Sequence, residues 1–163
     1  MNSLRLFFTY SILLLIAAFF VLWLVDYSPF DIPATIPNLG YSTYTVLMFV
    51  LIIIILIVFQ KKLIKIKPAT SIMELVLFSL GACMLSQIIY QVVRQFWFLR
   101  NENNNKFHDL AITLVSILFI SGFLGLSIAT EIKKANTAIN ILTSLLALGT
   151  IVLLEKYFPH IGW

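Results

Sequence analysis

The sequence contains little charge and almost no cysteine. Only 11% of its 163 residues are charged, against about 25% in an average soluble domain, so the chain cannot cover a soluble fold of this size with a charged surface. The single cysteine, Cys83, has no partner in the chain, which excludes an intrachain disulfide scaffold. A hydrophobic fraction of 61% excludes a disordered chain. A polytopic membrane protein is the class that remains.

Five long apolar runs follow one another along the chain. A helix crosses the hydrocarbon core of a bilayer in about 20 apolar residues, and the middle of each run is free of charge. Every connection between the runs is short, and none has the composition of a soluble module. The sequence therefore predicts an all-α bundle of five transmembrane helices in a single domain, residues 1–163, with spans at 4–25, 41–59, 72–93, 110–130 and 138–154.

The start of the third span has its own signal. Ser71 and Glu74 have the S-x-x-E spacing of a capping box, in which hydroxyl and carboxylate each accept a backbone N–H of the first turn. Pro68 disfavours helix immediately before it. A helix beginning next to Ser71 is expected.

Basic residues predict the orientation, because they collect in cytoplasmic segments. The N-terminus and the second and fourth connections together carry seven of them, whereas the opposite side carries four. The seven are Arg5, Lys61, Lys62, Lys65, Lys67, Lys133 and Lys134, and the four are Arg94, Arg100, Lys106 and Lys156. We therefore expect a cytoplasmic N-terminus and an external C-terminus, in a bacterial cytoplasmic membrane.

Four lysines gather directly after the second span. Lys61, Lys62, Lys65 and Lys67 alternate with apolar residues, a pattern typical of contact with anionic lipid headgroups. The net charge of +4 does not indicate nucleic acid binding, because the chain has no extramembrane domain and no aromatic stacking platform. The lipid bilayer is the expected partner of this cluster.

Polar residues share one face of the third span. At 100° per residue this face covers roughly 140°, and its members are Ser79, Cys83, Ser86, Gln87, Tyr90, Gln91 and Arg94. Hydrocarbon cannot satisfy an amide, so the face is expected to meet other helices or to line a pore.

The fourth and fifth spans carry matching features. Small or hydrogen-bonding side chains that allow close helix packing stand at Ser121, Gly122, Gly125, Ala129, Asn140 and Ser144. Polar side chains of this kind commonly hold transmembrane helices together. The simplest arrangement packs spans three, four and five around one shared polar seam.

Residues that carry chemistry are scarce. The spans contain no nucleophile beside a base, no paired carboxylates and no cysteine pair, so no catalytic residue and no cofactor is predicted. Both histidines, His108 and His160, fall on the predicted outer rim near Asp109 and Glu155, where they are candidate ligands for a metal or haem. Loops also collect polar residues without any such role.

Three functions fit these patterns. The first is a small membrane subunit or assembly protein that docks on other transmembrane helices, either unrelated subunits or further copies of itself, without chemistry of its own. The second is a homo-oligomeric channel lined by the third span. The third is a membrane enzyme or redox protein that uses the outer-rim histidines.

Overall fold

The computed structural model describes residues 3–27, 43–93, 106–134 and 137–157, and within them every regular element is a helix. Each predicted span corresponds to one helix. The five are α1 (Ser3–Tyr27), α2 (Thr43–Ile66), α3 (Ile72–Val93), α4 (Lys106–Ile132) and α5 (Thr137–Tyr157).

Four of these helices are long and apolar enough to cross a membrane, over Ser3–Leu24, Val46–Ile66, Ile72–Val93 and Leu114–Ile132. The fifth apolar stretch, Thr137–Leu153, is shorter. The chain is thus a helical bundle compatible with a membrane protein.

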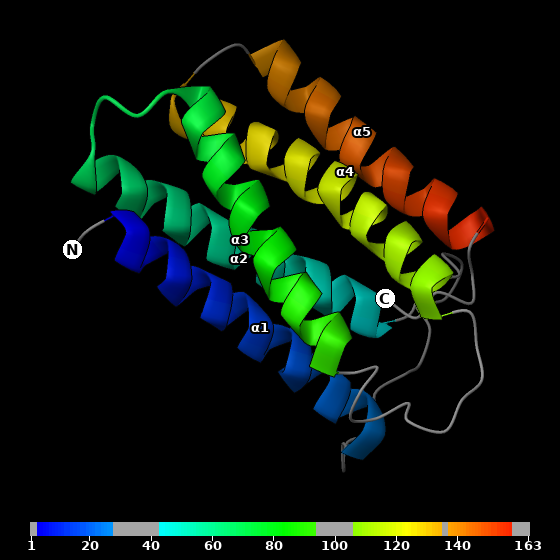
Figure 1. Ribbon diagram of the computed structural model, residues 1–163. Coiled ribbons are helices and arrows are strands. Elements are labelled where there is room, and N and C mark those ends of the chain that lie inside the picture. The colour runs from blue at the N-terminus through cyan, green and yellow to red at the C-terminus, as the bar shows by residue number, and fades with distance from the viewer. Residues whose placement is uncertain (1–2, 28–42, 94–105, 135–136, 158–163) are drawn as a thin grey trace.

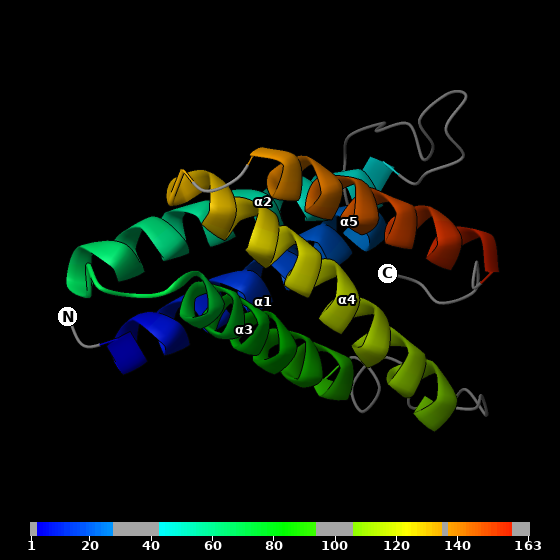
Figure 2. The same cartoon turned by 90° about the horizontal axis from the view of Figure 1, so that it is seen from above.

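The helices alternate in direction and pack as a group of four with one addition (Figures 1 and 2). Within the group of four, α3 packs most extensively against α4, and α1 packs against α2 and α3. The contacts of α2 with α3 and α4 are smaller. The remaining helix, α5, lies along the edge of the bundle and packs mainly against α4. Because α5 has one principal neighbour, most of its circumference is exposed.

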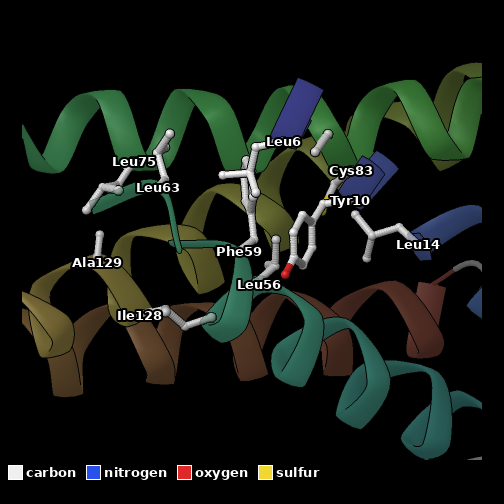
Figure 3. Close-up of a cluster of buried hydrophobic side chains, with 11 residues drawn as sticks. Leu6, Tyr10, Leu14, Leu56, Phe59, Leu63, Leu75, Cys83, Ile128 and Ala129 are labelled. Carbon is white, nitrogen blue, oxygen red and sulfur yellow. The ribbon is translucent and has the colours of Figure 1, made fainter. Parts of the chain in front are cut away.

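The core lies where α1 to α4 meet. Figure 3 shows side chains from all four helices in one cluster, and its central aromatic pair is Tyr10 of α1 and Phe59 of α2, with ring centroids 5.1 Å apart. On α1 the buried positions Leu6, Tyr10 and Leu14 recur every four residues, so one stripe of the helix faces this core.

The seven basic residues of the orientation argument belong to one end of the bundle. Figure 1 shows that α1, α3 and α5 begin and α2 and α4 end at this end, which also holds the described connections after α2 and α4. We call it the basic end; its residues are Arg5, Lys61, Lys62, Lys65, Lys67, Lys133 and Lys134.

The capping box at the start of α3 is confirmed. The Glu74 backbone N–H donates to Ser71 Oγ (3.1 Å), and the Ser71 backbone N–H donates to Glu74 Oε2 (2.8 Å). Two backbone donors that the helix itself leaves without partners are thereby satisfied. These two hydrogen bonds fix the start of α3, directly after the short connection from α2.

Candidate functional site

The predicted polar face of α3 points into the bundle. Five of its seven members are buried, and Gln87 is partly exposed. Arg94 lies outside the described residues. The buried five are Ser79, Cys83, Ser86, Tyr90 and Gln91.

A buried glutamine of α2 joins three helices at one point. Gln60 is 0% exposed, and its Nε2 donates to Ser79 Oγ of α3 (2.8 Å) and to the Gly125 backbone carbonyl of α4 (3.0 Å). We call Gln60, Ser79 and Gly125 the three-helix node. Its hydrogen bonds fix the positions of α2, α3 and α4 relative to one another.

Gly125 lies where α3 and α4 pack against each other. A Cβ at this position would be in ordinary contact, 3.4 Å from Ser79 Cβ and 3.9 Å from the Val76 backbone. A side chain longer than that of alanine would therefore separate the two helices and move the carbonyl out of reach of the amide. The other half of the amide is unpaired: Gln60 Oε1 is the buried side-chain atom of the described residues that has no hydrogen-bond partner.

Several buried hydroxyls, two of them expected to join helices, are satisfied within their own helix. Ser121 Oγ donates to the Ile117 carbonyl (2.5 Å), Thr143 Oγ1 to the Ile139 carbonyl (2.8 Å), and Ser86 Oγ to the Cys83 carbonyl (2.8 Å). Such bonds let a small hydroxyl lie in an apolar environment without a partner on another helix.

A second polar cluster lies between α4 and α5. Ser127 Oγ donates to Asn140 Oδ1 (2.5 Å) and lies 2.7 Å from Ser144 Oγ, while Asn140 Nδ2 donates to Glu131 Oε2 (2.6 Å). We call these four residues the α4–α5 cluster. The expectation of one seam shared by α3, α4 and α5 is wrong in this respect, since α4 has two separate polar contacts. The Gly125 carbonyl accepts from Gln60 of α2 at the node, and the α4–α5 cluster joins α4 to α5.

The small residues of α4 lie on its side toward the other three core helices. Ala129 is fully buried in the four-helix core, and a Cβ on Gly122 would lie 3.8 Å from Leu80 of α3. On α5, by contrast, a Cβ added to Gly149 would meet nothing within 4 Å. Gly149 therefore has no close-packing role among the described residues.

At the basic end, three lysines contact other parts of the protein. Lys67 forms an ion pair with Glu74 (Nζ to Oε1, 2.6 Å), and Lys133 Nζ donates to the Pro68 carbonyl (3.3 Å). Lys62 Nζ lies 5.8 Å from the centre of the Tyr10 ring, within the range of a cation–π interaction.

The structure describes the side chain of neither outer-rim histidine. His160 lies beyond the described residues, and His108 is in the first turn of α4 where only the helix is described. Among the described residues there is no group of three His, Cys, Asp or Glu side chains that could hold a metal ion.

Sequence reasoning missed Gln60. The predicted second span ends one residue before it, at Phe59, yet α2 continues to Ile66. Its position one turn after Leu56 and just under one turn before Leu63, both buried, is the signal that could have identified it.

Comparison with family models, with curated proteins and with solved structures finds no match to this chain.

Proposed function

We propose that this chain is an integral membrane protein of a bacterial cytoplasmic membrane, with five crossings, a cytoplasmic N-terminus and an external C-terminus. It serves as a small subunit or assembly protein that binds other transmembrane helices. The observation that carries this proposal is the one-sided attachment of α5.

The side of α5 that faces away from α4 is its outer face, defined by Leu142, Leu145, Gly149 and Val152. The three large side chains of this face are 57%, 60% and 50% exposed. They lie on the side of the helix opposite to the buried Thr143 and Ala147. A whole helix surface is thus available to a partner without any rearrangement of the bundle.

Gly149 favours a helix as the occupant of this surface. Glycine lowers helix stability by about 1 kcal/mol relative to alanine, and no close contact with the described residues offsets that loss at Gly149. Small residues on a transmembrane helix let a second backbone approach closely. A partner helix that crosses α5 at Gly149 packs closely there and so offsets the loss of helix stability at this glycine.

The polar face of α3 gives less support to the channel alternative. A pore formed by several copies needs polar side chains on the perimeter of each copy. Five members of this face are instead buried within a single chain. Docking through α5 leaves that buried face undisturbed.

Photo-crosslinking in intact membranes tests the proposal. A photoreactive side chain at Leu145 of α5 is compared with one at Ile16 of α1, which is similarly exposed at 57%. We expect Leu145 to give protein adducts, either with another membrane protein or with a second copy, and Ile16 to give lipid adducts. Lipid adducts alone at both positions would exclude docking through α5.

A further inference from the structure

Two lysines of α2 point away from the bundle at the basic end. Lys61 and Lys65 are exposed and one helical turn apart. They lie on the side of α2 opposite to its buried residues Leu56, Phe59 and Leu63. Their ammonium groups therefore extend from the outer surface of the helix near its end.

The same side of α2 continues as an apolar stripe. Val50, Ile54 and Val58 are each four residues apart and exposed, and Lys61 and Lys65 follow at the next two helical repeats. A single surface thus changes from apolar to doubly cationic toward the end of α2. We call these five residues the α2 stripe.

Lys61 and Lys65 also differ from neighbouring lysines in having no protein partner among the described residues. Lys62 is held over Tyr10, and Lys67 is paired with Glu74. Of the four lysines in this cluster, two are therefore occupied by the protein and two are available to an external anion. Arg5 and Lys134, also without such a contact, stand singly on α1 and after α4.

We propose that the α2 stripe binds one anionic phospholipid. The phosphate lies between the Lys61 and Lys65 ammonium groups, and an acyl chain lies along Val50, Ile54 and Val58. Two lysines four residues apart rise about 6 Å along a helix, a separation that one phosphate group can bridge. This inference rests on the membrane insertion in the proposed function, but not on docking through α5.

Native mass spectrometry of the detergent-purified chain tests the site, with phosphatidylglycerol and phosphatidylcholine as probes. We expect the first phosphatidylglycerol to bind more tightly than phosphatidylcholine, and K61Q/K65Q to reduce that preference about tenfold. The matched control is K133Q/K134Q, which removes the same charge at the same end and should change the preference less than about twofold.

The two double variants distinguish a specific phospholipid site on the α2 stripe from general electrostatic attraction between the basic end and anionic lipid. An equal loss in both double variants would overturn the proposal, because it would indicate diffuse attraction to the whole basic end. Displacement of the lipid by a comparable concentration of free glycerol phosphate would also overturn it, since that would show a phosphate site without an acyl component. Neither result depends on whether α5 forms protein adducts, so failure of this site and failure of the docking proposal are distinguishable.

Discussion

Gln60 places a primary amide beside the apolar core cluster, directly next to the buried Leu56, Phe59 and Leu63 of its own helix. Its Nε2 makes two hydrogen bonds, each worth about 0.6 to 2 kcal/mol between membrane helices. Its Oε1 has no partner, and a buried unsatisfied acceptor costs about 1 to 3 kcal/mol. The two contributions nearly offset each other, so the amide fixes the relative position of the helices more than it adds to stability.

This balance predicts different results for two substitutions at Gln60. Gln60→Leu should keep the free energy of unfolding within about 1 kcal/mol of wild type, because the lost hydrogen bonds are offset by removal of the unpaired acceptor. Gln60→Ala should cost about 2 kcal/mol or more, because it also leaves a cavity among α2, α3 and α4. Unfolding in a denaturing detergent titration measures both. Equal and large losses would show that the hydrogen bonds dominate.

Cys83 offers a probe of the same core. Its side chain is 4% exposed and belongs to the four-helix cluster shown in Figure 3. A thiol reacts through its thiolate and needs access to the reagent. We expect Cys83 to resist a maleimide in mild detergent and to react fully after denaturation. Rapid labelling in mild detergent would contradict the packing described for α3.

At the scale of helices, the sequence predicted α3 at the residues where it lies, and the other helices in the right order. The second span was predicted to end at Phe59, whereas α2 ends at Ile66. Charge along the sequence marks where hydrocarbon ends, but the helix continues because lysines can extend from the interface while Leu63 remains in the core. The end of a charge-free run and the end of a helix are thus separate properties, and at α2 the run ends before the helix does.

The sequence also showed which residues are polar without showing which helices they join. Ser121 and Asn140 both matched the pattern of residues that join helices. Ser121 donates within its own helix, whereas Asn140 bonds to α4. A hydroxyl has one proton to donate and can place it on its own helix, whereas the amide of Asn140 uses both its acceptor and a donor on Ser127 and Glu131 of α4. This difference emerges only when neighbouring helices are placed.

Two glycines predict opposite responses to the same substitution. Gly125→Leu should destabilise the chain by about 1 to 3 kcal/mol and break the hydrogen bond from Gln60, because a Cβ there already lies 3.4 Å from Ser79 Cβ. Gly149→Leu is the control, since nothing within 4 Å opposes a Cβ at that position. It should preserve stability and maleimide resistance while reducing protein adducts from Leu145. A stable Gly125→Leu variant with wild-type packing would contradict the node.

At the scale of the whole molecule, the alternating direction of five helices places seven basic residues at one end. The sequence predicted this grouping from the order of its spans alone. It did not predict that α1 to α4 form one core while α5 packs at the edge, because all five runs are similarly apolar and their pairwise contacts leave little trace in composition. The polar contacts of α4 follow the same arrangement, with the node toward α2 and α3 and the α4–α5 cluster toward α5.

Because α5 packs at the edge of the bundle, whether it crosses the membrane is the most informative test of the proposed topology. If α5 crosses the membrane, alkaline phosphatase fused after Trp163 should be active outside the cytoplasm, and a fluorescent protein fused before Met1 should fluoresce inside, as seven basic residues at the basic end require. Both reporters in one compartment would mean that a predicted span does not cross. Because the apolar part of α5, Thr137–Leu153, is the shortest, α5 would then be the helix that stays at the interface. Gly149→Leu separates this possibility from loss of docking, since it should reduce adducts from Leu145 without changing either reporter.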